Sequence, residues 1–247
     1  MSAQLTIEGA TKRFGGVTAN EDISLEVPEG RVVGLIGPNG SGKSTLFNSI
    51  VGYHPVDGGS IRFEGREITR LRTAEIARLG LIRTFQQTHV FVQMTGLQNM
   101  AISDAEAGHG LFRLMRPVSA ETRERAEALL AFCGLYGKRH LMAGELSFGQ
   151  RKLLELAMAL MVRPRMLLLD EPTAGINPTL INGVIERLQR ANREFGVTLF
   201  VIEHNMRVIM SLAEHIHCLA HGRLLSSGPP EALRNDQRVI DAYLGAR

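Results

Sequence analysis

One octapeptide, GPNGSGKS at residues 37–44, restricts the possible folds of this chain more than any other feature. It fits the pattern G-x-x-x-x-G-K-[ST] and lies between the continuous apolar run RVVGLI and the segment KSTLFNSIVG, which has helical character. A strand, a glycine-rich loop and a helix in this order make a phosphate-binding loop, whose successive backbone N–H groups point at an anion. We therefore expect an α/β fold that binds a nucleotide at this loop.

The expected contacts of the loop follow from the chemistry of a nucleoside triphosphate with Mg²⁺. The glycines let the backbone curl, Lys43 would bridge the β- and γ-phosphate oxygens, and the Ser44 hydroxyl would be a metal ligand. The predicted nucleotide-binding residues are Gly37, Pro38, Asn39, Gly40, Ser41, Gly42, Lys43, Ser44 and Thr45.

Two acidic residues end a second apolar run, RMLLLDEP. Ligands of open α/β sheets bind at the carboxyl ends of the strands, so Asp170 and Glu171 are expected near the phosphate loop. Asp170 would hold Mg²⁺, and Glu171 would orient and deprotonate the attacking water. For Glu171 alone, capping of the next helix is an alternative.

Two further polar residues follow apolar runs. Gln86 ends LIRTFQ, where its oxygen could touch the metal and the water, and His204 follows LFVIE, where a neutral imidazole could hydrogen-bond the γ-phosphate. Taken alone, Gln86 could be a solvated loop residue and His204 a core or cap residue. Their order relative to the two stronger motifs favours the functional interpretation.

The stretch ELSFGQRK precedes the apolar helical run KLLELAMALMV. Ser147 and Gln150 have the spacing of a capping box, which predicts that a helix begins here. A helix N-terminus concentrates unpaired N–H groups and partial positive charge, so this one could meet an anion.

The order of phosphate loop, Gln86, LSFGQ, LLLDEP and His204 resembles the ATP-binding cassette of ABC transporters over essentially the whole chain. The segments TKRFGGVTANEDISLEV, DEPTAGINP, VIEHNM and DAYLGAR resemble the ATP-binding subunits of branched-chain amino-acid importers and of the related urea importers. The resemblance implies a P-loop NTPase cassette in the α/β class. Its core lobe, 1–87 and 164–247, would combine a mixed β core with an antiparallel β subdomain, and 88–163 would be an inserted α-helical lobe.

The resemblance also implies finer roles. Phe14 would stack on adenine, although an aromatic residue there could equally belong to the core. The signature residues Ser147, Phe148, Gly149 and Gln150 would contact the ATP held by a second cassette, and the loop AGINP at 174–178 would touch that cassette. Phe148 replaces the first glycine of the common Leu-Ser-Gly-Gly-Gln form.

The implied activity is ATP hydrolysis with Mg²⁺ that powers import of branched-chain amino acids, or alternatively of urea, amides or other small solutes. Implied partners are transmembrane permease subunits, a second cassette that is identical or paralogous, and indirectly a periplasmic or surface solute-binding protein. The chain would be peripheral at the cytoplasmic face of the membrane, because no run of roughly 18 apolar residues occurs. Two alternatives are a soluble ABC-type ATPase of translation or DNA repair and a degenerate cassette that scarcely hydrolyses ATP.

Charge and cysteine content narrow these possibilities. The net charge is only +3 and the arginines are interspersed with acids, so we expect no nucleic-acid partner. Cys133 and Cys218 are the only cysteines, and their apolar contexts indicate buried thiols in a reducing compartment. In HIHCLAH, strand alternation puts His215 and His217 on one face and Cys218 on the other, which disfavours a zinc site.

Overall fold

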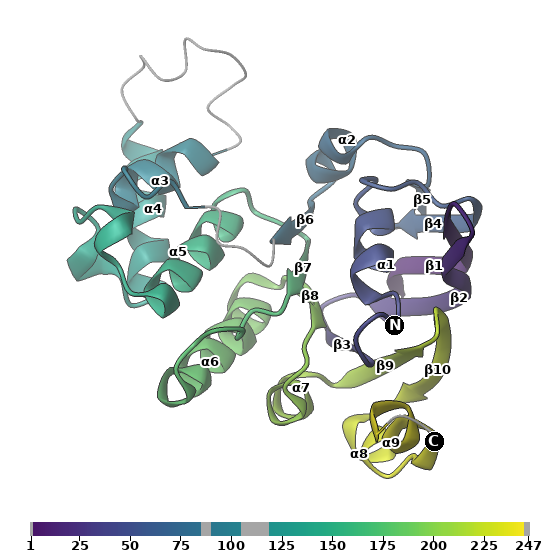
Figure 1. The fold of residues 1–247 in the computed structure, drawn as a ribbon. Helices are drawn as coiled ribbons and strands as arrows, with labels where there is room; N and C mark the ends of the chain where they lie inside the picture. The colour runs from purple at the N-terminus through teal and green to yellow at the C-terminus, as the bar shows by residue number, and fades with distance from the viewer. Residues whose placement is uncertain (1, 85–89, 105–118, 245–247) are drawn as a thin grey trace. The chain divides into compact units, whose positions relative to one another are not determined.

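The computed structural model describes residues 2–84, 90–104 and 119–244 (Figure 1). The chain divides into two compact units. The core unit comprises Met1–Arg83, Arg165–Pro172 and Leu188–Arg247, and the helical unit comprises Thr84–Pro164 and Thr173–Arg187. The predicted Gln86 lies outside the described residues.

The division differs from the sequence-based one by a few residues at 84–87 and at Pro164, and by one longer segment. Residues 164–247 were all expected in the core lobe, but Thr173–Arg187 groups with the helical unit. Two contacts give the physical reason. Arg187 donates to the Cys133 carbonyl (3.2 Å), and a β-carbon added to Gly175 would lie 3.0 Å from the Phe148 ring.

The first sheet of the core unit is antiparallel, with strand order β2-β1-β4-β5. Its strands are β1 (Ala3–Phe14), β2 (Val17–Pro28), β4 (Gly58–Phe63) and β5 (Arg66–Glu67). Along β2, buried and exposed residues alternate from Ile23 onward, as expected for a strand with one wet face. The antiparallel β subdomain implied by the resemblance is therefore confirmed.

The second sheet has the order β10-β9-β3-β8-β7-β6. Its strands are β3 (Val32–Ile36), β6 (Leu81–Thr84), β7 (Met166–Asp170), β8 (Thr198–Ile202), β9 (His215–Ala220) and β10 (Arg223–Gly228). Strands β9, β3, β8 and β7 are parallel, whereas β10 runs antiparallel to β9. Every residue of β3, β7 and β8 is buried, which is why these strands are continuous apolar runs.

Five short helices accompany these sheets. They are α1 (Lys43–Ile50), α2 (Thr73–Arg78), α7 (Met206–Leu212), α8 (Pro230–Arg234) and α9 (Gln237–Leu244). Helix α1 packs on the second sheet through Phe47, whose ring centroid lies 5.0 Å from that of Phe200 in β8. This contact fixes the helix that follows the phosphate loop.

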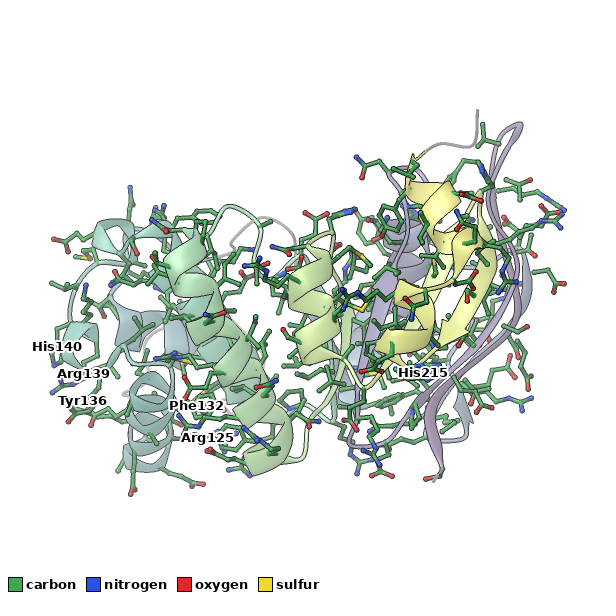
Figure 2. All side chains as sticks on the ribbon, turned by 90° about the horizontal axis from the view of Figure 1, so that it is seen from below. Arg125, Phe132, Tyr136, Arg139, His140 and His215 are labelled. Carbon is green, nitrogen blue, oxygen red and sulfur yellow. The ribbon has the colours of Figure 1, made fainter. Side chains whose placement is uncertain are left out.

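The helical unit contains α3 (Gly96–Ser103), α4 (Ala120–Phe132), α5 (Phe148–Met161) and the first part of α6 (Pro178–Phe195). Two 3-10 turns, η3 (Tyr136–Lys138) and η4 (Ala143–Glu145), precede α5. Arg125, labelled in Figure 2, donates to the carbonyls of Leu160 and Met161 at the end of α5. An arginine at this position satisfies carbonyls that lack a partner within the helix.

The capping box at the start of α5 is confirmed. The Ser147 hydroxyl accepts the Gln150 N–H at 3.3 Å, and the Gln150 side chain accepts the Ser147 N–H at 3.0 Å. Within the described ranges, no helix has the length and apolar character needed to cross a bilayer.

Two of the three histidines of HIHCLAH, His215 and His217, form a hydrogen-bonded chain. His215 Nε2 lies 2.8 Å from the Ser227 hydroxyl, which lies 2.9 Å from His217 Nδ1, while His217 Nε2 bonds the Glu26 carbonyl at 3.0 Å. The part of the chain that the structure describes contains no cluster of three potential metal ligands. Burial lowers the pKa of His217 to about 4, so this ring is neutral in the folded protein. Both cysteines are buried, as predicted.

The depressed pKa of His217 predicts a stability loss in acid. Between pH 6.5 and about 4 the unfolded chain takes up a proton that the folded chain excludes. The free energy of unfolding should therefore fall by roughly 3 kcal/mol over this interval because of this residue. Urea unfolding at pH 7 and pH 5 should show a weaker pH dependence for His217→Gln than for the wild type.

His140 supplies the control, since it is exposed (Figure 2). The variant His140→Gln should keep the pH dependence of the wild type. An unchanged pH dependence in His217→Gln would contradict the assignment of the buried neutral ring.

Candidate active site

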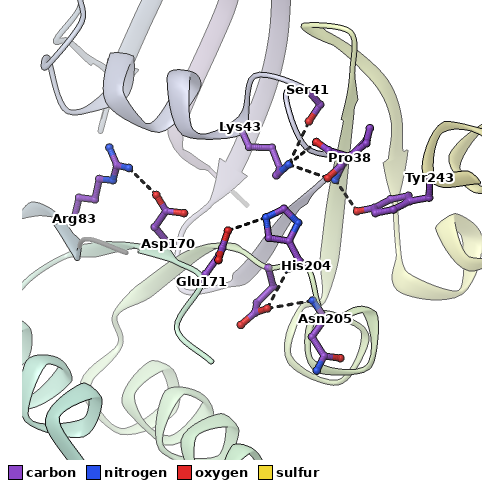
Figure 3. A network of polar contacts seen from close by, with 11 residues as sticks. Pro38, Ser41, Lys43, Arg83, Asp170, Glu171, His204, Asn205 and Tyr243 are labelled. Atoms are coloured by element: carbon purple, nitrogen blue, oxygen red, sulfur yellow. Dashed lines mark hydrogen bonds and ion pairs between the residues drawn. The ribbon is translucent and has the colours of Figure 1, made fainter. Parts of the chain in front are cut away.

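The candidate site lies where β3, β7 and β8 of the core unit end. These strands are parallel, so the loops after them meet at one edge of the sheet. The phosphate loop follows β3. Asp170 is the last residue of β7 and Glu171 comes directly after it, and His204 follows β8. Figure 3 shows these side chains together with the loop.

The phosphate loop has a backbone conformation that requires glycine at two positions. Gly37 has φ 146° and Gly42 has φ 98°, both outside the range that residues with a side chain readily adopt. Space excludes a side chain as well. A β-carbon on Gly37 would lie 2.1 Å from the Leu219 carbonyl oxygen, and one on Gly42 would lie 2.4 Å from that of Ala19.

Three segments that are distant in sequence hold this loop. Asn20 of β2 donates from Nδ2 to the Gly42 carbonyl (3.1 Å), and the Gly222 N–H donates to the Ser41 carbonyl (3.2 Å). The N–H of Gly37 donates to the Tyr243 hydroxyl of α9 at 2.8 Å. Sequence reasoning missed Asn20 and Tyr243. The only feature by which the sequence could have indicated Asn20 is a polar residue in a strand at a position that faces the interior of the protein.

Lys43 begins α1, and its ammonium is held by the loop itself. Its Nζ donates to the carbonyls of Gly37 (2.8 Å) and Pro38 (2.9 Å) and to the Ser41 hydroxyl (3.3 Å). Burial lowers the pKa of Lys43, and the nearby carboxylates Glu171 and Asp170 oppose this shift. The cation is therefore placed at the loop that is expected to receive the phosphates.

Asp170 ends β7 and is buried. Its Oδ2 accepts a hydrogen bond from Arg83 Nη2 at 2.7 Å, and the same guanidinium also donates to the Asn48 side chain of α1. Arg83 was part of the quoted segment LIRTFQ, but sequence reasoning gave it no role.

A second Asp170 oxygen, Oδ1, accepts no hydrogen bond from the described residues. Together with the exposed Ser44 hydroxyl it offers the oxygen donors that Mg²⁺ prefers, so these residues fit the expected ion.

Glu171 and His204 form a pair. His204 Nε2 lies 2.7 Å from Glu171 Oε1. Glu171 has φ 50°, and its N–H donates to the Ile202 carbonyl (2.9 Å), so a strained residue is tied to the neighbouring strand. The buried Glu203 accepts the N–H groups of His204 (3.1 Å) and Asn205 (3.2 Å), which fixes the start of α7. Sequence reasoning did not single out Glu203.

Phe14 ends β1 and is 43% exposed, which excludes the alternative that it is a core residue. Its ring meets the His54 ring edge-on, with centroids 5.3 Å apart, and the Lys12 ammonium lies 5.3 Å from its centroid. The ring therefore presents a free area at the rim of the core unit.

The signature residues lie in the helical unit at the start of α5. Ser147 and Phe148 are exposed, whereas Gly149 and Gln150 are half-buried. Phe148 replaces a glycine of the common signature and is expected at the surface that meets a partner. In the structure its ring lies against Gly175, which has φ 72°. Gly149 is close to Ile176. The signature thus packs on the loop 174–178 of the same chain.

Asn177 of that loop has a structural role, since its side chain accepts the Thr179 N–H at 3.1 Å at the start of α6.

Known proteins with this architecture match the whole chain. Residues 20–174 match the family model described as ABC transporter, and 223–247 match that described as branched-chain amino acid ATP-binding cassette transporter. The high-affinity branched-chain amino acid transport ATP-binding protein BraF of Pseudomonas aeruginosa is 40% identical, covering 98% of this chain and 97% of its own length. LivG of Escherichia coli K12, with the same description, is 34% identical over the same shares of the two chains.

Solved structures agree with these matches. The ADP conformation of MJ1267, an ATP-binding cassette of an ABC transporter, has a TM-score of 0.90 and 33% identity, covering 99% of this chain and 100% of its own. A dimeric post-hydrolysis state of the cassette MJ0796, bound to ADP and Pi, has a TM-score of 0.77 and 25% identity, covering 92% and 98%. The predicted fold, an α/β cassette with an antiparallel and a mixed sheet, is confirmed.

The contact between Phe148 and Gly175 predicts a measurable coupling. Gly175→Ala should lower the free energy of unfolding by about 1–2 kcal/mol because of its positive φ, and by about 1 kcal/mol more because the ring must shift. In a Phe148→Ala background the second contribution should disappear. Denaturant unfolding of the two single variants and the double variant measures it.

Gly30→Ala is the matched control, because Gly30 has φ 69° and no atom near the added carbon. It should reproduce the backbone contribution alone. Equal losses for Gly175→Ala with and without the ring would refute the steric coupling.

Proposed function

Because this chain belongs to the ABC transporter family, among the ATP-binding subunits of branched-chain amino-acid transporters, we propose that it powers uptake of these amino acids with MgATP bound at the sheet edge. The chain is an ATPase of this family, and its hydrolysis is coupled to transport. One observation carries the site assignment. Lys43, Asp170 and the Glu171–His204 pair come from separate segments and lie at one edge of the core-unit sheet.

Binding of the phosphates would use the loop as its geometry allows. The N–H groups of the loop other than those of Gly37 and Ser41, which bond to Tyr243 and Pro38, would meet the anion together with those of the first turn of α1. Lys43 would exchange loop carbonyls for phosphate oxygens. Ser44 and Asp170 would hold Mg²⁺, with Gln86 as a further ligand implied by the family pattern. The ion would neutralise charge on the β- and γ-phosphate oxygens. Phe14 would stack on the adenine.

Hydrolysis would depend on Glu171 as the general base. Its carboxylate would orient the attacking water and accept the proton, and the water oxygen would displace ADP in line from the γ-phosphate. In the structure His204 Nε2 holds the carboxylate by the observed 2.7 Å contact, and with ATP bound the same N–H would turn from the carboxylate to the γ-phosphate. Lys43 would stabilise the charge that develops on the transferred group.

The signature residues would complete the site of a second cassette. In our proposal, Ser147, Phe148, Gly149 and Gln150 meet the γ-phosphate bound by a partner that is either a second copy or a paralogue. The exposed hydroxyl of Ser147 and the N-terminus of α5 support this role, since helix N-termini favour anions. The dimeric MJ0796 cassette, with ADP and Pi, is a precedent in a similar protein.

Transport would require membrane subunits. We infer that the chain is peripheral at the cytoplasmic face of the membrane, docks on permease subunits and works with a periplasmic or surface solute-binding protein. The relatives that carry the branched-chain description favour branched-chain amino acids over urea, amides or other solutes. The same relatives match nearly the full chain, which argues against a role in translation or DNA repair.

Solute uptake tests the proposal directly. The chain, its co-purifying membrane subunits and the solute-binding protein are reconstituted in vesicles with MgATP inside, and labelled leucine and urea are offered outside. We expect ATP-dependent leucine uptake. The variant Glu171→Gln should bind ATP but lose at least about 100-fold in both phosphate release and uptake, because the base is gone.

Uptake of urea without leucine would replace the proposed solute by the alternative one. Hydrolysis near the wild-type rate in Glu171→Gln would refute the base assignment.

The trans role of the signature predicts a separate defect. Ser147→Arg should leave nucleotide affinity of the monomer unchanged, because Ser147 contributes nothing to its own chain's phosphate loop in this proposal. ATP hydrolysis should vanish, because the arginine prevents the close approach of the partner's phosphate. Titration with a fluorescent ATP analogue and a phosphate-release assay measure the two effects. Hydrolysis by a protein that stays monomeric would contradict it.

A further inference from the structure

The C-terminal helix reaches the first residue of the phosphate loop. Tyr243 lies in α9, and its hydroxyl accepts the N–H of Gly37 at 2.8 Å (Figure 3). The two residues are 206 positions apart. Tyr243 lies in the segment 223–247 that matches the branched-chain family model, whereas Gly37 lies outside it. Nothing in the predicted mechanism uses this segment.

Gly37 is the residue through which this contact can act on the nucleotide. Its N–H is held by Tyr243, and its carbonyl accepts the Lys43 ammonium at 2.8 Å. The residue is buried, and the Leu219 carbonyl leaves no space beside it. Tyr243 and Lys43 are therefore joined through a single residue that has little freedom to move.

Helix α9 is itself fixed to the core unit. Asp236, just before the helix, accepts hydrogen bonds from the Ser226 hydroxyl of β10 (2.7 Å) and from the Arg238 N–H (3.0 Å). Val239 is buried at 2% exposure and Leu233 of α8 at 1%. These contacts hold the tyrosine in place without involving the phosphate loop.

We propose that Tyr243 is a positioning residue for ATP binding, which holds the Gly37 backbone, and with it the phosphate loop and Lys43, in place for the phosphates. The inference rests on the proposed function, because it assumes that the loop binds a nucleotide. Burial raises the pKa of Tyr243 to about 12, so the hydroxyl stays neutral and remains the acceptor at any working pH.

The hydroxyl can be removed without disturbing the packing of the helix. The Tyr243 ring borders a cavity of about 800 Å³, together with Met206, Met210 and Ile240. Phenylalanine would keep the ring in this place and remove only the oxygen that meets Gly37. Tyr243→Phe therefore separates a role in phosphate positioning from a role in holding α9.

Tyr243→Phe should weaken phosphate binding selectively. The substitution removes one hydrogen bond and leaves the buried N–H of Gly37 without its acceptor. This loss corresponds to about three- to ten-fold weaker affinity for ADP and a similar rise in KM for ATP. At saturating ATP, kcat should change by less than about two-fold, because Lys43 is then held by the bound phosphate oxygens rather than by the Gly37 carbonyl, and the Glu171–His204 pair is untouched. Inhibition by adenosine, which has no phosphate, should be unchanged.

Leu244→Ala supplies the control, since Leu244 is the neighbouring residue of α9 and is 79% exposed. It should match the wild type in all three measurements, and the thermal unfolding midpoint of Tyr243→Phe should stay within about 2 °C of the wild type. Wild-type affinity for ADP in Tyr243→Phe would overturn the inference. Equal losses for ADP and adenosine with a lower midpoint would also overturn it, because the role would then be purely structural. If the wild type itself bound no ADP, the proposed function would fail instead.

Discussion

The contact between the phosphate loop and the carbonyl groups behind it is the constraint on which the rest of the structure depends. Gly37 and Gly42 have no room for a side chain, because the carbonyls of Leu219 and Ala19 lie where a β-carbon would be. Only glycine at these two positions lets the loop pack this closely against Leu219 of β9 and Ala19 of β2. The loop is only eight residues long, yet it is held against strands of both sheets of the core unit.

The sequence predicts the parts of this arrangement that a local pattern encodes. The loop motif, the fully buried strands and the capping box of Ser147 are each set by residues close together in the chain, and the structure confirms the strands and the cap. The roles of the site residues stay predictions. What the sequence did not reveal are contacts between distant residues, such as Arg83 with Asp170 and Tyr243 with Gly37. No periodicity marks such pairs, because each partner satisfies the local rules of its own element.

Phe148 shows why a departure from a motif is harder to interpret than a match. In the sequence it stands only as a glycine replaced by an aromatic residue at a surface expected to meet a partner. In the structure the ring lies on Gly175 of the same chain, so its immediate neighbour is the loop 174–178. The same contact explains why Thr173–Arg187 groups with the helical unit, a boundary that the order of strands and helices alone did not predict.

The two adjacent acids of LLLDEP have different partners, and this difference fits the two different roles proposed for them. Asp170 faces Arg83, a cation that stays charged at every pH a protein experiences, so one carboxylate oxygen is fixed while the other remains available. A metal ligand needs this kind of fixed, ionised oxygen.

Glu171 instead faces His204, a side chain that can hold a carboxylate in place through a hydrogen bond. The proposed general base must accept a proton and lose it again in each cycle, which a permanently charged neighbour would oppose. In the proposed mechanism the separation of the two partners therefore matters as much as the presence of the two acids. This separation depends on β6 and the loop after β8, neither of which is adjacent to LLLDEP in the chain.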